Sequence, residues 1–247
     1  TDLGTVTVGG TADFTTDADA PITLDGASSY TGAVSLTTAP SGGDATLTNL
    51  VDAVDFATSS VSGALTVSTT DDAVTQTGGS ITTGGVTSFT SGTADITLTN
   101  GSNSFGDLTV SGGVVAITEN DAITDGGTWS TTGTTTLNAG TNDIELNEAL
   151  STTGALNLTG GTATVDRDGA IDIVGGSVTT LNLTSGAGIT DSGTITVTNG
   201  LSATGDATGA AITLDDIDVS GGTVALSTTD SNATIDNDSA IDFAAST

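Results

Sequence analysis

Apolar residues of this chain recur in short triplets in which one polar residue lies between two apolar ones. Alternation with a period of two predicts β-strands with one buried face. Gly, Asn, Asp or Ser separate the triplets, and these residues favour turns because they tolerate positive φ or bond to their own backbone. The clearest run is Ile144-Glu-Leu146, Leu156-Asn-Leu158, Ala163-Thr-Val165, Ile171-Asp-Ile173, Leu181-Asn-Leu183 and Ile195-Thr-Val197. No long segment has a helical period, so the pattern predicts an all-β protein of very short strands.

One phrase recurs along the chain and is followed each time by further apolar triplets. Its copies are Ala73-Val-Thr-Gln-Thr-Gly-Gly79, Ala122-Ile-Thr-Asp-Gly-Gly-Thr128, Gly188-Ile-Thr-Asp-Ser-Gly-Thr194 and a truncated Thr1-Asp-Leu-Gly-Thr5. The step to the next triplet is nearly constant. It runs from Val74 to Ile96 (96 − 74 = 22), from Ile123 to Ile144 (144 − 123 = 21) and from Ile189 to Ile212 (212 − 189 = 23).

A step of about 22 residues that holds two or three short strands describes one coil of a solenoid. We therefore predict a right-handed, three-sided parallel β-helix of about ten coils, roughly 50 Å long. Residues 73–121 and 122–169 match at an offset of 122 − 73 = 49 residues, which we interpret as about two coils. Composition is uniform and no linker is visible, so residues 1–247 are predicted to form one β-helical domain.

Aromatic residues are scarce, which favours a narrow core of small aliphatic side chains. Trp129 and Tyr30 are single occurrences, and we expect them to pack in loops or the core rather than to form a sugar platform. The chain has no cysteine and therefore no disulfide framework. It also shows neither a signal peptide nor an apolar run of transmembrane length.

The charge is extreme, because 30 acidic residues face one basic residue, Arg167, for a formal net charge of −29. Phosphate binding needs Lys and Arg, so nucleic acid and anionic membranes are not expected as partners. We interpret most of the acids as a solvated face that keeps the rod soluble. Divalent-cation binding is the alternative.

Two acidic clusters are candidates for catalysis. Asp215, Asp216 and Asp218 lie close in sequence, with Asp216 and Asp218 predicted on the same outward face, and Asp166 and Asp168 flank Arg167. A carboxylate pair could hydrolyse a glycoside. The chain has no His and no Lys, so the usual general base is missing. We predict that it is not an enzyme, assign no catalytic residue, and keep a polysaccharide-acting enzyme as a remote alternative.

Calcium is the one cofactor alternative. Asp2, Asp125 and Asp191 recur at the same position of the phrase, and stacked coils could gather such carboxylates. The calcium-binding nonapeptide of β-rolls is absent. The favoured interpretation is that each Asp closes a turn by bonding to backbone N–H groups, with no metal and no other cofactor.

Thr-x-Thr pairs suggest ice binding when they recur regularly on one flat face. Here the pairs do not fall once per coil at one position of the phrase, so we interpret Thr as a strand-surface residue. The pairs are Thr5/Thr7, Thr46/Thr48, Thr97/Thr99 and Thr194/Thr196.

The phrases that carry a family resemblance are Ala122–Thr128, Thr134-Thr-Thr-Leu-Asn-Ala-Gly140, Asn142-Asp-Ile-Glu-Leu-Asn147 and Ser111-Gly-Gly-Val-Val115. With these, nearly the whole chain resembles the repeat region of filamentous-haemagglutinin-like exoproteins. The resemblance implies a right-handed parallel β-helix that is extracellular or on the surface of a Gram-negative bacterium, exported by two-partner secretion. It also implies a structural or adhesive shaft, used in cell adhesion, biofilm or filament formation.

The chain begins within a phrase and shows no polar cap at either end, which predicts either an excerpt of a longer protein or a stacking unit. The second function hypothesis is therefore a self-associating filament subunit stacked end to end. Expected partners are neighbouring repeats or copies of the chain, joined through coil ends. Host or matrix glycans are a further partner class.

Overall fold

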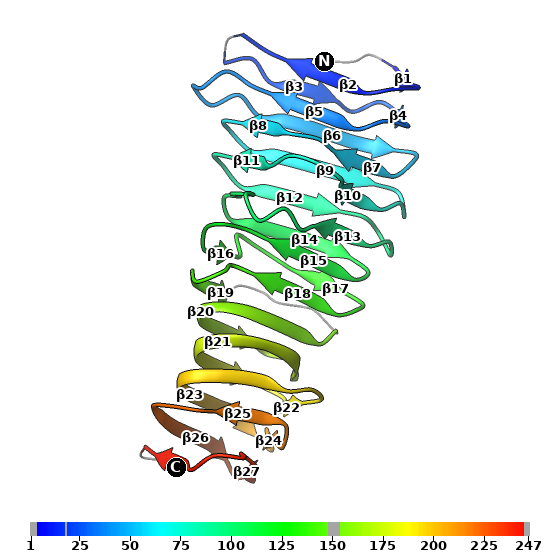
Figure 1. The fold of residues 1–247 in the computed structure, drawn as a ribbon. Coiled ribbons are helices and arrows are strands. Elements are labelled where there is room, and N and C mark those ends of the chain that lie inside the picture. The colour runs from blue at the N-terminus through cyan, green and yellow to red at the C-terminus, as the bar shows by residue number, and fades with distance from the viewer. Residues whose placement is uncertain (1–3, 18, 148–153, 245–247) are drawn as a thin grey trace.

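The computed structural model describes residues 4–17, 19–147 and 154–244. They form a rod of about 11 turns, and the strand pairs of all three sheets run parallel. Figure 1 shows the coils stacked along one axis from the N-terminus to the C-terminus. The predicted parallel β-helix is therefore confirmed. None of the described residues forms a helix with the length and apolar character needed to cross a membrane.

The strands of the first half are short, as the triplets predict. They are β1 (Thr7–Val8), β2 (Ala12–Thr15), β3 (Ile22–Leu24), β4 (Ser29–Tyr30), β5 (Val34–Thr37), β6 (Ala45–Leu50), β7 (Val54–Phe56), β8 (Ser59–Val61), β9 (Leu65–Thr69), β10 (Val74–Gln76), β11 (Ile81–Thr83), β12 (Thr87–Thr90), β13 (Ile96–Leu98) and β14 (Leu108–Gly112). β3, β6, β9, β12, β14 and a later strand, β17 (Ser130–Thr131), form a separate six-stranded sheet.

The second half contains three much longer strands. The remaining elements are β15 (Val115–Thr118), β16 (Ile123–Thr124), β18 (Thr135–Asn138), β19 (Ile144–Leu146), β20 (Leu156–Arg167), β21 (Ile171–Ser185), β22 (Ile189–Asp191), β23 (Ile195–Thr208), β24 (Ile212–Leu214), β25 (Ile217–Val219), β26 (Thr223–Thr229), β27 (Ala233–Ile235) and β28 (Asp242–Phe243).

Here the prediction of separate triplets was wrong, because triplets expected to be divided by turns share one strand. β20, β21 and β23 run for 12, 15 and 14 residues and bend at glycines without leaving the ladder. Gly176 shows why: its φ is +117°, and an added Cβ would lie 1.9 Å from the carbonyl oxygen of Leu158. A glycine at such a corner lets the backbone turn where any side chain would collide.

Three stacks of equivalent residues mark the sides of the coil. Stack 1 runs through Val54, Val74, Ile96, Val115, Thr135 and Leu156. Stack 2 runs through Ile123, Ile144, Ala163, Leu181, Leu201, Val224 and Phe243. Stack 3 runs through Ile171, Ile189, Ile212 and Ala233.

The predicted steps are confirmed as direct neighbours, since Val74 pairs with Ile96, Ile123 with Ile144 and Ile189 with Ile212. The interpretation of the 49-residue offset as about two coils needs a correction. Two coils lead from Val74 to Val115, and Ile123 lies 123 − 115 = 8 residues further, on the next side. The three copies of the phrase therefore lie in stacks 1, 2 and 3, and face three directions.

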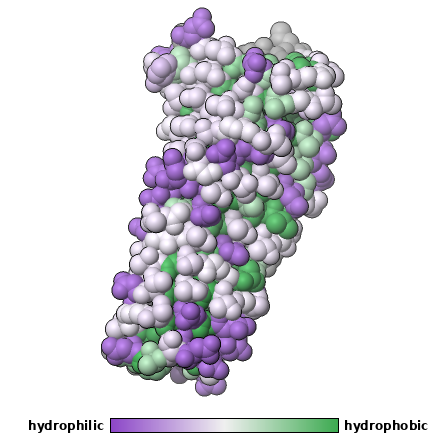
Figure 2. Space-filling model, viewed as in Figure 1, coloured by the Kyte–Doolittle hydropathy of each residue, from purple (hydrophilic) through white to green (hydrophobic). Residues whose placement is uncertain are grey.

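The core consists mainly of small aliphatic side chains, with a few aromatic ones. Trp129 is fully buried, and its Nε1 donates a hydrogen bond of 2.7 Å to the carbonyl of Leu108. Tyr30 is also buried and meets Phe14 edge to face, with 5.8 Å between ring centroids. Both single aromatics therefore pack in the core, as expected. Figure 2 shows hydrophilic residues spread along the rod on the visible face.

Candidate functional site

Carboxylates at the turns make a recurring contact between successive coils. In each case an Asp side chain accepts a hydrogen bond from a backbone N–H about one coil later, and we call these contacts carboxylate brackets. They join Asp44 to Ala64 (2.8 Å), Asp55 to Thr77 (2.8 Å), Asp71 to Thr93 (2.9 Å), Asp95 to Val114 (2.9 Å) and Asp143 to Thr162 (2.7 Å). Hydrogen bonds to a charged acceptor are stronger than neutral ones. Many acids predicted to be only a solvated face therefore also tie the coils together.

The Asp of the recurring phrase takes part in the same way. Asp125 accepts from the N–H of Asn147 at 3.1 Å, and Asp191 accepts from Asp215 and Asp216 at 2.8 and 3.0 Å. Both Asp side chains bond to backbone N–H groups, as expected, and these partners lie 22 to 25 residues away in the next coil. Burial raises the pKa of the Asp191 carboxyl, although the two backbone N–H groups act to lower it.

The calcium alternative gains no support from geometry. Asp2, the remaining member of the set, lies outside the described residues. Within residues 4–17, 19–147 and 154–244, no three acidic side chains come together in an arrangement that could hold a metal ion. The absence of a cofactor stays a prediction.

The structure brings Asp215, Asp216 and Asp218 together around one small hollow of about 130 Å³. The next coil adds Asp236 and Asp238, which the sequence pattern did not connect with the other three. All charged groups that line the hollow are carboxylates, so acid–base chemistry there would have no cationic partner in the lining. The expectation that the chain is not an enzyme stays a prediction.

Arg167 is not among the residues that line this hollow. Its neighbours in sequence, Asp166 and Asp168, are exposed, whereas Arg167 is half-buried, and burial lowers its pKa. The guanidinium lies over Gly169, where an added Cβ would lie 2.9 Å from Nη2. The Asp166–Arg167–Asp168 cluster therefore lies at the end of β20, and none of its residues lines the carboxylate hollow.

Hydroxyl side chains are more regular than the count of Thr-x-Thr pairs suggested. On the six-stranded sheet the half-buried outward positions stack directly upon one another in five successive coils. They are Thr23, Thr46, Thr66, Ser88 and Thr109. The expectation concerned Thr-x-Thr pairs, and among these five positions only Thr46 belongs to one, so that expectation stays a prediction. The single hydroxyl stack was hidden in the sequence because the coils change in length.

A cluster of buried polar side chains lies in the middle of the rod. Asn103 is fully buried, and its Oδ1 accepts hydrogen bonds from the Ile81 N–H (2.8 Å) and from Nε2 of Gln76 (2.7 Å). Its Nδ2 donates to the carbonyls of Leu98 (3.3 Å) and Thr118 (3.2 Å). The Asn103 amide thus connects three successive coils in the way that backbone groups do elsewhere.

Glu119 completes this cluster. It is 3% exposed, and its Oε2 accepts a 2.9 Å hydrogen bond from the backbone N–H of Phe105. Burial, the largest cause, raises the pKa of the Glu119 carboxyl to about 8; the Phe105 N–H lowers it and the nearby Asp121 carboxylate raises it. Sequence reasoning missed both Asn103 and Glu119. Spacing did not mark them, because the step from Ile96 to Val115, 115 − 96 = 19 residues, is within the range of the other coils.

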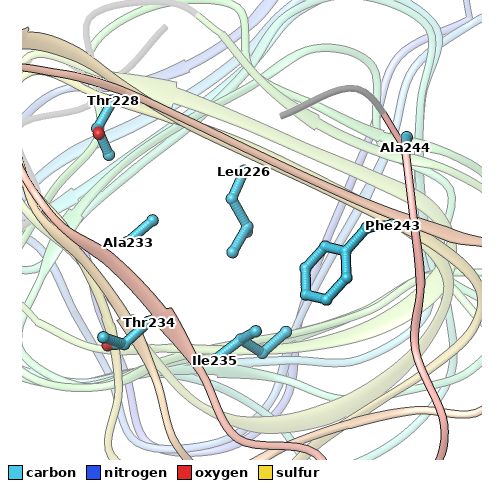
Figure 3. A pocket seen from close by; sticks show the side chains of 7 residues that line it. All are labelled: Leu226, Thr228, Ala233, Thr234, Ile235, Phe243 and Ala244. Atoms are coloured by element: carbon cyan, nitrogen blue, oxygen red, sulfur yellow. The ribbon is translucent and has the colours of Figure 1, made fainter. Parts of the chain in front are cut away.

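The C-terminal coil presents an apolar hollow of about 620 Å³. Leu226, Ala233, Ile235 and Phe243 point into it in Figure 3, with the hydroxyl-bearing Thr228 and Thr234 at its side. Phe243 is 56% exposed, which is unusual for a side chain in register with buried Val224. Such a surface can bury apolar area against another coil.

The stacked coils place the chain in the class of parallel β-solenoid repeat proteins. It belongs to the family described as repeats of unknown function (DUF5649), which matches residues 1–37, 42–110, 104–159 and 160–227. Neither the curated proteins nor the solved structures contain a match to the chain. The family accounts for the repeats and names neither a haemagglutinin nor a secretion route.

Proposed function

We propose that this chain is a length of structural shaft in an extracellular protein of a Gram-negative bacterium, of the filamentous-haemagglutinin-like kind. The observation that supports this role is the coil-to-coil bonding along the rod. Parallel backbone ladders continue from β2 to β28, and carboxylate brackets reinforce them on the outside. A stack in which each coil contacts its neighbours provides length and stiffness, which are the properties that a surface adhesin or biofilm fibre needs.

An adhesive role would place glycans of the host or matrix against the side of the rod. A shallow hollow of about 380 Å³ lies on stack 2 at Gly200, which has no side chain to fill it. Thr180, Asn182 and Ser202 line it and offer neutral hydroxyl and amide groups. These groups suit a neutral glycan, whereas the net charge of −29 disfavours nucleic acid and anionic membranes.

Deletion of one whole coil tests the shaft role. Removal of residues 45–64 from the native protein joins the coil before Ala45 to the equivalent position Leu65, and so preserves register and leaves the glycan hollow intact. We expect the shortened protein to fold and the producing cells to attach to surfaces and form biofilm as before. Leu47→Asp in the full-length protein is the control, because an unpaired charge on this fully buried side chain should prevent folding. A folded whole-coil deletion that no longer supports attachment would assign the binding site to this segment instead.

The second candidate is a filament subunit, and the apolar hollow at the C-terminal coil favours it. Sedimentation velocity of the purified chain should then show association that increases with concentration, in about 0.5 M salt to screen the acidic charge. Phe243→Asp should abolish it, whereas Val51→Asp, an exposed apolar residue far along the rod, should not. The intact mass in native material separates the two roles. A mass near 23.6 kDa indicates a subunit, and a mass many times larger indicates a shaft.

A further inference from the structure

The backbone ladder of one side of the rod is interrupted in the middle. Ser104 forms an isolated bridge with Thr82 in the preceding coil, and the regular ladder of stack 2 starts at Ile123. Between them, two backbone N–H groups donate hydrogen bonds across the gap, in addition to the bond from Asn103 Nδ2 to the Thr118 carbonyl. The Asn120 N–H donates to the Asn103 carbonyl at 2.9 Å, and the Phe105 N–H donates to the Glu119 side chain. A carboxyl group therefore takes the position of a ladder carbonyl.

The carboxyl group of Glu119 lies in surroundings that suit its neutral form. Within the described residues, its Oε1 is buried and has no hydrogen-bond partner. The groups that bond to Glu119 are backbone groups, namely the Phe105 N–H and, for its own N–H, the Asn138 carbonyl. The one charge that acts on it in the described part of the chain is the Asp121 carboxylate, which repels a second negative charge. A protonated carboxyl satisfies Phe105 through Oε2 without placing a charge in the core.

The segment that Glu119 holds is residues 99–107, which lead from β13 to β14. Its side chains reach inward at two places. Asn103 is tied to the coils on either side, and the ring of Phe105 meets the ring of Phe89 edge to face, 5.7 Å between centroids. Release of this segment would uncover Phe105 and remove the cross-link between neighbouring coils.

We propose that Glu119 and residues 99–107 form a proton-operated joint in the rod. The joint is closed while Glu119 carries its proton. When the proton passes to solvent, the buried carboxylate draws water and Phe105 moves out of the core. The two halves of the rod are then held at this level by stack 1 and the six-stranded sheet. Asn103 and Gln76 are neutral at every accessible pH. Burial is the main cause of the raised pKa of Glu119, and the Asp121 carboxylate raises that pKa further.

Titration of the side chain itself is the first test. The chain has three glutamates, at positions 119, 145 and 148, so labelling with ¹³C-glutamate gives three carboxyl signals. Glu119→Gln identifies the signal of Glu119. We expect that signal to titrate near pH 8 in the folded wild type, and Asp121→Asn to shift its midpoint downward. A midpoint near 4.5, like that of an exposed glutamate, would overturn the proposal, even if the Gln variant failed to fold.

Hydrogen exchange at the Phe105 amide tests the opening. After correction for the intrinsic rate, wild-type protection should fall about thirtyfold between pH 6.5 and pH 9, because the opened carboxyl ionises freely. Glu119→Gln keeps an acceptor for Phe105 and should remove this fall. The Ile144 amide, in the next coil of stack 2, should keep its protection. Equal pH dependence in wild type and Glu119→Gln, or an equal fall at Ile144, would contradict a local joint.

Discussion

Two parts of the rod connect successive coils with different chemistry. In residues 156–208, long strands with an apolar interior join each coil to the next, and Ala163, Leu181 and Leu201 lie directly above one another. In residues 99–123 the equivalent ladder is broken, and buried Asn103 and Glu119 make the connection. The rod nevertheless continues through both parts.

The difference shows what each kind of joint responds to. Apolar packing has no direction and does not depend on protonation. The stability of the continuous ladders therefore depends on the volume of the buried side chains. Buried polar groups must each find a partner, so the joint around Asn103 and Glu119 responds to loss of a single hydrogen bond or proton. Substitutions in the two parts of the rod separate these responses.

Truncation in the continuous ladder should have the largest effect. Leu181→Ala removes a fully buried side chain between two neighbouring coils and should cost about 3.5 kcal/mol of unfolding free energy. Because no titratable group is involved, the loss should be the same at pH 6.5 and pH 9. Urea unfolding followed by circular dichroism measures it. A loss below about 1 kcal/mol would mean that the coils collapse around the cavity.

Replacement of the buried Asn103 should lower the free energy of unfolding by slightly less. Asn103→Leu has similar volume but leaves the Ile81 N–H and the Leu98 and Thr118 carbonyls without partners, at about 3 kcal/mol in total. Fluorescence of the buried Trp129 should report the change along with circular dichroism. Asn182→Leu is the control: this residue points outward, and its change should stay within about 0.5 kcal/mol. Equal effects of the two substitutions would remove the distinction between the joint and the outer face.

The pH dependence of global stability should distinguish the joint from the ladders. The folded-state pKa of Glu119 is raised from 4.5 to about 8, so its stabilising contribution is complete below pH 4.5 and is lost as pH rises through 8. Between pH 6.5 and pH 9 the wild type should lose about 2 kcal/mol more than Glu119→Gln. Both proteins share the repulsion among the other acids. Parallel curves for the two proteins would exclude a raised pKa.

Removal of one carboxylate bracket should have the smallest effect. Asp143→Ala deletes the acceptor of the Thr162 N–H, and because the bond is exposed to water the loss should be about 1 kcal/mol. Asp206→Ala, at an exposed position outside the brackets, should change stability by less than about 0.5 kcal/mol. Both variants remove one negative charge. The difference between their free energies of unfolding therefore measures the contribution of the carboxylate bracket alone.

The repeat architecture could be predicted from the sequence because alternation and spacing have direct geometric meaning. Val74 and Ile96 were expected to be neighbours, and they are. The bends of β20, β21 and β23 were missed, since a glycine that ends a strand and one that bends it are the same in the sequence. Only the crowding at Gly176, which appears when the previous coil is in place, distinguishes them.

The polar contacts between coils could be predicted only in part. Asp215, Asp216 and Asp218 were expected together because they are close in the chain, and they share a hollow. The carboxylate brackets and Glu119 depend on groups 14 or more residues away, and the step between paired residues varies from 173 − 156 = 17 to 224 − 201 = 23 residues. Unless the register between coils is known, the sequence does not indicate which N–H group will donate a hydrogen bond to a given carboxylate.

The recurring phrase advances by whole coils plus one side, from stack 1 at Val74 to stack 2 at Ile123 and stack 3 at Ile189. Successive copies of the phrase therefore lie on different sides of the rod, one side further round each time. Gain or loss of one 49-residue unit would rotate everything downstream by about a third of a revolution, as well as change the length. A group attached beyond the insertion would then face a different direction around the rod axis. The number of repeat units would therefore set both the length of the rod and the orientation of what it carries.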